Sequence, residues 1–327
     1  MPNVDLRHVD DSLPGISRRR LKRGWAYHDN EGRRITDRDE IDRLNAIGMP
    51  PAYERCWFCA DPSGHIQATG YDARGRKQYR YHVEFRAAQD AGKFDRCAAF
   101  GMALPKLRAR VDHAISGRAP TRDAVIAAVV RLLDIGFIRV GNESYARENR
   151  SFGATTLRNR HATLTRERIR LVFRGKSGKL HKLTIADRRL ARIVRRCQDL
   201  PGQRLFQYLN GDGTPHPVGS SEVNAWLREA TGEDFSAKHF RTWSASVIAF
   251  ETLVAAKGPI SVKALVEPVC AALGNTPAIA RKSYIHPALI DAAREGLPKG
   301  LNMPRRTKYL SATERGLIAF LTNGGTD

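Results

Sequence analysis

Apolar and polar positions alternate in short runs over the first 90 residues, a spacing typical of half-buried strands. Two of these runs, at 65–71 and 77–85, flank the turn-forming segment DARGR at 72–76 and predict a hairpin. Alternation in the second run places four side chains on one face: Tyr79, Tyr81, Val83 and Phe85. The pattern predicts a small β-rich domain over residues 1–90.

From about residue 90 the apolar positions recur at the spacing of amphipathic helices. Thr121 has the position of an N-cap for a helix that ends near Gly136. Ser236 is expected to cap another helix. The apolar side of that helix carries four large residues: Phe240, Trp243, Val247 and Phe250.

Three further signals complete the pattern. A second hairpin is predicted from the runs 168–173 and 179–185 around the turn RGKSG at 174–178. Thr276 and Pro277 have the positions of N-cap and first residue of a short helix. The letters SATE at 311–314 predict a capping box before a final helix, which either packs on its own chain or meets a neighbour. The expected fold class is α+β, with a larger, mainly helical domain over residues 91–327.

The net charge indicates the kind of binding partner better than the overall composition does. The chain carries 55 Lys and Arg against 34 Asp and Glu, a formal net charge of +21. These basic residues are spread through both halves and interleaved with aromatic residues, which favours a nucleic-acid partner. No apolar run approaches the roughly 18 residues of a membrane span, and no signal peptide is visible. We therefore expect a soluble cytoplasmic protein that binds no membrane.

Cysteine spacing and the motifs for nucleotide and metal binding indicate which cofactors the chain is expected to use. The five cysteines are scattered, and the C-x-x-C of Cys56 and Cys59 has no second pair at ligand spacing. Reduced thiols are the favoured interpretation, with a zinc site as the alternative. The sequence lacks a phosphate-binding G-x-x-x-x-G-K-[ST] loop, an H-E-x-x-H motif and an acidic metal cluster. These observations predict a protein that works without ATP and without a tightly held metal.

Several basic residues lie where predicted elements begin or end. Arg139 follows a helix in GFIRVGNESY, and Lys176 lies at the tip of the second hairpin. Lys238 and Arg241 form K-x-x-R in the first turn of a helix, and Tyr284 ends NTPAIARKSY. Taken singly, each residue also fits surface charge, a bridge to a carboxylate or core packing.

Taken together, five segments in this order resemble the type IB DNA topoisomerases, in particular their compact poxvirus-like bacterial branch. The segments are GHIQATGYDARGRKQYRYH, IRVGNESYARENRSFGATTLRNRH, VFRGKSGK, KHFRTW and LGNTPAIARKSY. The resemblance implies a monomer that closes as a C-shaped clamp on double-stranded DNA, associated with the nucleoid. It also implies a reaction that needs no ATP and no metal cofactor, with Mg²⁺ at most a stimulator.

The resemblance assigns a role to each basic residue and to the tyrosine. Tyr284 matches the nucleophile that joins the 3′-phosphate of a nicked strand, and Arg139 and Arg241 match the pair that binds the non-bridging oxygens. Arginine suits that task because its planar donors meet phosphate in pairs and keep their charge. Lys176 matches the general acid for the leaving oxygen, and Lys238 matches a basic residue near the same proton pathway.

Two positions depart from the poxvirus pattern. Asn275 occupies the place of a histidine, and its uncharged amide is expected to contribute less as a donor to a phosphoryl oxygen. Ser177 occupies the place of an acidic residue beside the catalytic lysine. Both departures put the turnover rate in question rather than the activity.

The resemblance also implies DNA contacts outside the reaction site. Gln78, Tyr79 and Tyr81 match residues that contact the major groove, and Tyr145 matches a tyrosine that contacts phosphate. Core packing is the competing interpretation for Tyr145. It is also expected for at least one member of the Tyr79 and Tyr81 pair, because the two share a face.

Two other functions remain open at this level. A tyrosine recombinase would share the catalytic domain, but it normally has H-x-x-R where this chain has K-x-x-R at Lys238, and its N-terminal domain is helical. A non-catalytic DNA-compacting protein would need the charge but not the set of Arg139, Lys176, Arg241 and Tyr284.

Overall fold

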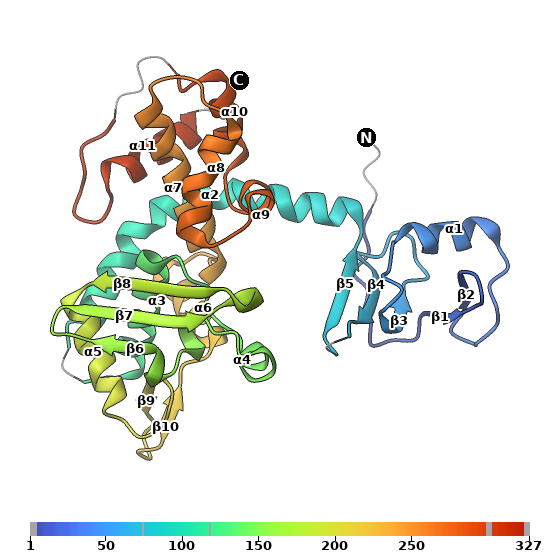
Figure 1. The fold of residues 1–327 in the computed structure, drawn as a ribbon, viewed down its shortest axis with the longest axis horizontal. Coiled ribbons are helices and arrows are strands. Elements are labelled where there is room, and N and C mark those ends of the chain that lie inside the picture. Colours follow the sequence, from blue (N-terminus) through green and yellow to red (C-terminus); the bar gives the residue numbers. More distant parts are fainter. Residues whose placement is uncertain (1–4, 74, 118, 299–302, 324–327) are drawn as a thin grey trace. The chain divides into compact units, whose positions relative to one another are not determined.

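A computed structural model describes residues 5–73, 75–117, 119–298 and 303–323 of the chain (Figure 1). The chain divides into two compact units, Met1–Lys93 and Phe94–Asp327. The first unit contains a β-sheet and the second is mainly helical, so the predicted α+β class is confirmed. No helix within the described ranges is long and apolar enough to cross a membrane.

The first unit is built on an antiparallel five-stranded sheet in the order β2-β1-β3-β4-β5. Its strands are β1 (Ile16–Arg20), β2 (Trp25–His28), β3 (Glu54–Phe58), β4 (Ile66–Tyr71) and β5 (Lys77–Tyr81). Helix α1 (Arg38–Ala46) begins after Asp37, whose side chain accepts from the Asp39 N–H. The helix buries Leu44 against Ile16, Tyr27 and Phe58 of the sheet, and this cluster is the core of the unit.

The hairpin predicted in this unit is present, but its second strand was predicted too long. Helix α2 (Val83–Ala114) begins directly after β5, so Val83 and Phe85 lie in its first turn and not in the sheet. His82 explains the change of structure, because its Nδ1 accepts from the Glu84 N–H at 3.2 Å as an N-cap side chain does. Val83 and Phe85 continue the apolar alternation of β5 although they belong to the helix that follows it.

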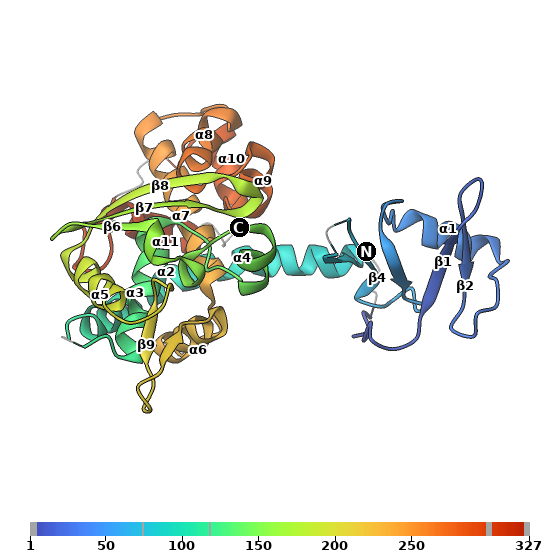
Figure 2. The ribbon, with the colours of Figure 1, turned by 60° about the horizontal axis from the view of Figure 1, so that its bottom comes forward.

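The second unit combines helices with two small antiparallel sheets (Figures 1 and 2). Most of α2 belongs to this unit, and the helices that follow it are α3 (Arg122–Gly136), α4 (Glu143–Asn149), α5 (Arg188–Gln198), α6 (Ser220–Thr231), α7 (Ala237–Ala256), α8 (Val262–Leu273), α9 (Pro277–Ser283), α10 (Pro287–Glu295) and α11 (Ala312–Asn323). The strands are β6 (Ala162–Leu164), β7 (Arg168–Arg174), β8 (Leu180–Ala186), β9 (Gln207–Leu209) and β10 (Pro215–Pro217). Helix α3 is buried on nearly every side and forms the centre of the core.

The local signals in this unit mostly match the structure. Thr121 caps α3 by accepting from the Ala124 N–H, and the hairpin β7–β8 turns at 175–179. Ser236 is the N-cap residue of α7 as predicted, and it forms a capping box with His239. Its N–H donates to Nδ1 of His239 at 2.9 Å. The predicted apolar side of α7 is confirmed for Phe240, Trp243 and Phe250, which are buried, while Val247 is half-buried.

The final helix packs on its own chain. Ser311 and Glu314 form the predicted capping box at the start of α11, with reciprocal hydrogen bonds of 2.8 and 3.1 Å. Leu317 is fully buried, and the ring of Phe320 lies 5.7 Å from that of Phe250 in α7. The segment after Pro304 therefore belongs to the core around α7.

All five cysteines are free thiols. Among the described residues, no group of three or more His, Cys, Asp and Glu side chains is close enough to hold a metal ion.

Candidate active site

Tyr284 lies at the point where the chain leaves a short helix. Its N–H still bonds the Ala280 carbonyl of α9 at 3.1 Å, but its own backbone has turned out of the helix. Ser246 of α7 is fully buried behind this turn. The Ser246 hydroxyl donates to the Tyr284 carbonyl at 3.5 Å and accepts from the His286 N–H at 3.1 Å. Ser246 therefore fixes the tyrosine turn to α7, and the sequence carried no signal for this role.

Arg241, on the first turns of α7, faces the ring of Tyr284. The guanidinium carbon is 4.9 Å from the ring centroid, and the arginine is only 3% exposed. Its donors bond the carbonyls of Phe137 and Leu273 and the side-chain oxygen of Asn275. The guanidinium group is thus held from three directions before any substrate arrives.

Asn275 joins this arginine to a second one. Its Oδ1 accepts from a terminal nitrogen of Arg139 and from one of Arg241, each at 3.1 Å. Only the amide oxygen can face two cations, so these contacts determine the orientation of the amide. Its Nδ2 is buried and has no partner within the described part of the chain. Asn275 therefore holds the two guanidinium groups side by side, a role that the sequence interpretation did not foresee.

The backbone of Arg139 is held as firmly as its side chain. Its carbonyl accepts from the Ala154 N–H at 2.8 Å. A Cβ at Gly153 would lie 2.5 Å from that same carbonyl oxygen, so only glycine allows this close approach. The loop after α3 is therefore packed so that Arg139 has one position relative to Asn275.

The two arginines change the acidity of the tyrosine. Burial raises the pKa of Tyr284, but the positive charges of Arg241 and Arg139 and hydrogen bonds from both lower it, and the net pKa lies below the usual 10.0. Burial and the charge of Arg139 in turn lower the pKa of Arg241. The two positive charges therefore stabilise the phenolate form of Tyr284 relative to that of a free tyrosine.

Lys176 lies at the tip of the hairpin β7–β8, which Figures 1 and 2 both show on the side of the unit where α9 lies. The lysine is exposed, and none of the described residues accepts a hydrogen bond from it. Ser177 and Gly178 follow with φ of 62° and 73°, in the left-handed region that a serine adopts only at some cost. The backbone of the tip is thus strained at Ser177 and is closed by the bond from the Gly175 N–H to the Lys179 carbonyl at 2.8 Å, while the Lys176 side chain points into solvent.

His181 in β8 connects this tip to the arginine pair, and the sequence interpretation missed it. Its ring stacks on Phe173 at 5.1 Å. A Cβ at Gly175 would lie 2.6 Å from its Nε2, and one at Gly274 would lie 3.4 Å from its Cε1. Burial lowers the pKa of His181, and the charges of Arg139, Arg241 and Lys179 lower it further.

The ring of His181 therefore lies between Gly175, which precedes Lys176, and Gly274, which precedes Asn275. The only sequence signal for this packing was this pair of glycines.

The remaining predicted residues lie apart from this cluster. Lys238 is exposed in the first turn of α7, and no contact brings it to the arginine pair within the described residues. Tyr145 is 48% exposed in the first turn of α4, so its interpretation as a core residue is wrong. Its contact with DNA stays a prediction.

In the first unit, Tyr79 and Tyr81 are 42% and 45% exposed, so the expectation that at least one packs in the core is also wrong. Their rings stack on each other at 5.9 Å, and Phe85 extends the stack at 5.7 Å from Tyr81. The reason is that β5 is an edge strand whose aromatic side chains cover one another. Gln78 bonds the carboxylate of Asp72 at 3.1 Å.

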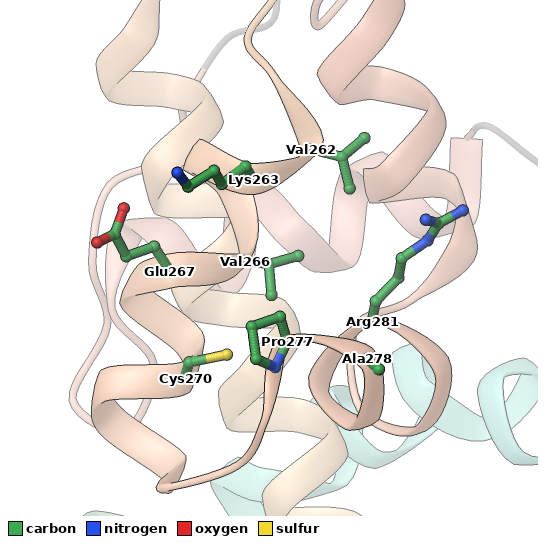
Figure 3. Close-up of a pocket in the computed structure, with 8 residues that line it drawn as sticks. All are labelled: Val262, Lys263, Val266, Glu267, Cys270, Pro277, Ala278 and Arg281. Carbon is green, nitrogen blue, oxygen red and sulfur yellow. The ribbon is translucent and has the colours of Figure 1, made fainter.

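An apolar hollow of about 460 Å³ lies between α8 and α9 (Figure 3). It is lined by Val262, Lys263, Val266, Glu267, Cys270, Pro277, Ala278 and Arg281. None of the residues around Tyr284 lines it, so the candidate reaction site is the arginine and tyrosine cluster and not this pocket.

Fold and site together define a class. A β-rich unit precedes a mainly helical unit in which a tyrosine lies against two fixed arginines, as expected for enzymes that cleave DNA through a tyrosine. A family model for the eukaryotic DNA topoisomerase I catalytic core matches residues 82–281, and one for the bacterial DNA topoisomerase IB N-terminal domain matches residues 24–72. The chain belongs to the type IB DNA topoisomerases, which are isomerases with DNA as substrate.

Relatives named DNA topoisomerase 1B agree with this assignment. The mimivirus protein is 30% identical over 297 residues, which cover 86% of this chain and 88% of the relative. The vaccinia virus (strain Copenhagen) protein is 21% identical over 249 residues, covering 74% of this chain and 76% of the relative. These similarities do not favour the recombinase or the non-catalytic alternative.

Proposed function

We propose that this enzyme relaxes supercoiled duplex DNA by cleaving one strand through Tyr284, allowing rotation and resealing the strand. The observation that carries this proposal is the position of the Tyr284 ring, 4.9 Å from the guanidinium carbon of Arg241, which Asn275 joins to Arg139. A phenol has a pKa near 10 and attacks poorly, so a nearby pair of positive charges is what this nucleophile needs.

The reaction conserves the number of phosphoester bonds. The phenolate oxygen of Tyr284, whose proton has passed to water, bonds phosphorus while the bond from phosphorus to the 5′ oxygen breaks, and that oxygen takes a proton from Lys176 and leaves as a hydroxyl. Arg139 and Arg241 bind the two non-bridging oxygens, whose charge grows in the transition state. The Nδ2 of Asn275, which is buried and has no partner among the described residues, is assigned as a further donor to one of these oxygens. Religation is the reverse, so no ATP or other cofactor is consumed.

Lys176 is the general acid for the 5′ oxygen in this scheme. An exposed side chain on a strained hairpin tip can move to the leaving group when DNA is bound. His181 supports the base of that tip without a charge of its own near neutral pH, because its pKa is lowered. Lys238 is assigned as a second basic residue near the path of this proton, because it lies at the beginning of α7, the helix that carries Arg241.

DNA contacts are assigned to both units, 1–90 as the DNA-binding domain and 91–327 as the catalytic domain. The exposed stack of Tyr79 and Tyr81 suits groove edges, Gln78 of the same strand is assigned to the groove with them, and exposed Tyr145 suits a phosphate. A monomer that closes as a clamp on the duplex, at the nucleoid, accounts for basic residues in both units. Mg²⁺ has no assigned step, and its effect is limited to stimulation.

A plasmid relaxation assay without ATP and with a metal chelator tests this function. Wild-type protein should relax the plasmid and, after denaturation, remain covalently joined to DNA. Tyr284→Phe should abolish both results with DNA binding nearly intact, because it removes only the nucleophilic oxygen. Tyr309→Phe is the matched control, since it removes a phenol outside the site. Relaxation by Tyr284→Phe within about tenfold of wild type would exclude this nucleophile.

A further inference from the structure

The final helix holds a buried carboxylate far along the chain from the reacting residues. Glu314 of α11 is 8% exposed, and it lies outside the residues 82–281 that the catalytic family model matches. Its Oε1 accepts from Arg108 at 2.7 Å and from Nε1 of Trp243 at 3.3 Å. Its Oε2 accepts from Arg108 at 3.0 Å and from the Ser311 N–H at 2.8 Å. Both oxygens of this carboxylate are therefore saturated.

Arg108 of α2 continues the network to a third helix. Its Nε and one terminal nitrogen each bond a carboxylate oxygen of Asp134 in α3 at 2.8 Å, and the other terminal nitrogen reaches the Tyr309 carbonyl at 2.5 Å. Burial opposes the charge on Glu314, but Arg108 outweighs it and holds the pKa of the Glu314 carboxyl below its usual value. The network is charged, buried and complete, and it joins α2, α3, α7 and α11.

Two branches of this network end on the two helices that hold Arg241, α7 and α3. Trp243 is two residues after Arg241 in α7 and is 2% exposed. Asp134 lies in the last turn of α3, three residues before Phe137, whose carbonyl accepts from Arg241. One branch therefore holds the helix that carries Arg241, and the other holds the end of the helix that supplies its acceptor.

Stability alone is a weak explanation for this arrangement. Burying charges costs desolvation free energy, and well-packed apolar residues often stabilise a core as well or better. What a charged, bidentate network adds is a defined geometry between the helices that it joins. That geometry matters here because an error of about 1 Å in a catalytic group can cost about a hundredfold in rate.

We propose that Glu314, together with Arg108 and Trp243, is a positioning group that holds Arg241 in register with its acceptors. The proposal rests on the role of Arg241 in the proposed function. It gives the C-terminal helix a part in catalysis although none of its residues touches the reacting atoms.

A pair of tryptophan variants separates positioning from general stability. Trp243→Phe removes one Nε1–H bond to a carboxylate. Trp226→Phe removes a bond of the same kind, and a shorter one, from the same unit, because Nε1 of Trp226 donates to Asp123 at 2.5 Å. Both tryptophans are 2% exposed, so the loss of packing is matched.

The measurements are single-turnover cleavage at saturating DNA, DNA affinity and Tm, all on the full chain well below unfolding. Trp243→Phe should slow cleavage by about ten- to a hundredfold with unchanged affinity. Trp226→Phe should lower Tm to a similar extent and leave the cleavage rate unchanged. Equal rates for the two variants would overturn the proposal.

A double-mutant cycle adds a second measurement that does not depend on tryptophan packing. Glu314→Gln should slow cleavage in the wild-type background and add less than about twofold in the Arg241→Ala background, because its effect passes through Arg241. Multiplicative defects would overturn the proposal. If Arg241→Ala alone cleaved at the wild-type rate, the proposed function would fail instead, so the two failures are distinguishable.

Discussion

The arginine pair and the hairpin tip of Lys176 are built in opposite ways within the same helical unit. Arg241 is 3% exposed and held by three acceptors, and Arg139 shares the Asn275 oxygen with it. Lys176 is exposed at a turn in which Ser177 and Gly178 both have positive φ. The arginine pair is fixed before substrate binds, whereas the exposed side chain of Lys176, without a hydrogen-bond partner among the described residues, is free to rotate.

This difference matches two kinds of chemistry. Charge that grows on the non-bridging oxygens is stabilised best by donors that need no reorganisation during the reaction. A proton donor has a different task, since it must reach the leaving oxygen late and then take the proton back for religation. We therefore expect variants of Lys176 and variants of the arginine pair to respond differently when the 5′ bridging oxygen of the DNA is replaced by sulfur.

The largest loss of cleavage rate is expected for Lys176 at the hairpin tip. Lys176→Ala should slow cleavage by about 10²–10⁴-fold on ordinary DNA, because an alkoxide leaves poorly without a proton. On a substrate whose 5′ bridging oxygen is replaced by sulfur, most of that defect should disappear, since a thiolate leaves without a proton. Single-turnover cleavage of the two substrates measures both values. Equal defects would mean that Lys176 only binds the phosphate, and Lys238 would become the first candidate for the acid.

On the fixed side, Arg241→Ala should slow cleavage by about 10²–10³-fold through the loss of one preorganised cation. Sulfur at the bridging position should restore little of this activity, because the non-bridging oxygens are unchanged. Arg110→Ala is the control, since Arg110 pairs with exposed Glu229 at the surface. Recovery of Arg241→Ala to the extent seen for Lys176→Ala would remove the distinction between the two regions.

The mobile region was easier to predict from sequence than the fixed one. A glycine on each side of K-S predicted a tight hairpin tip, because the conformation of a turn depends on its own residues. The caps at Thr121 and Ser311 are local for the same reason.

The contacts of the fixed region join residues that are far apart in sequence. Asn275 bonds Arg139 across 136 positions, and Glu314 bonds Arg108 across 206. No local pattern encodes such pairs. The resemblance to type IB topoisomerases pointed to Arg139, Arg241 and Tyr284 but not to Ser246 or His181, whose roles appear only once the helices are packed.

A smaller effect is expected where the two regions meet. His181→Ala removes the ring that packs beside Gly175 and Gly274, so the hairpin tip loses its support. Cleavage should slow by about ten- to a hundredfold, and the sulfur substrate should restore much of the rate because the effect passes through Lys176. His113→Ala, at an exposed position of α2, should leave both rates unchanged. A His181→Ala defect that persists with sulfur would place its main effect on the arginine pair.

The smallest effect concerns the beginning of the helix that carries Arg241. Burial lowers the pKa of His239 to about 4, with Lys238 and Arg96 adding to the effect, and its Nδ1 accepts from the Ser236 N–H at 2.9 Å. The folded protein therefore keeps this ring neutral, while the unfolded chain binds a proton below pH 6.5. The unfolded state binds more protons in this range, so stability should fall as the pH decreases from 6.5 toward 4. Above that window the contribution is constant.

Thermal unfolding of wild type and His239→Gln between pH 8 and pH 5 measures this contribution. The glutamine keeps an oxygen acceptor near Ser236 but does not titrate, so its Tm should fall less with acid, by about 2–4 °C. His161, whose pKa burial also lowers to about 4, remains in both proteins and accounts for part of the slope that persists. If the two proteins lost Tm in parallel, His239 would not set the acid limit of α7. In that case the acid stability of the helix that carries Arg241 would depend on contacts deeper in the core. The buried ion pair of Arg108 and Glu314 would then be tested by unfolding Glu314→Gln over the same pH range.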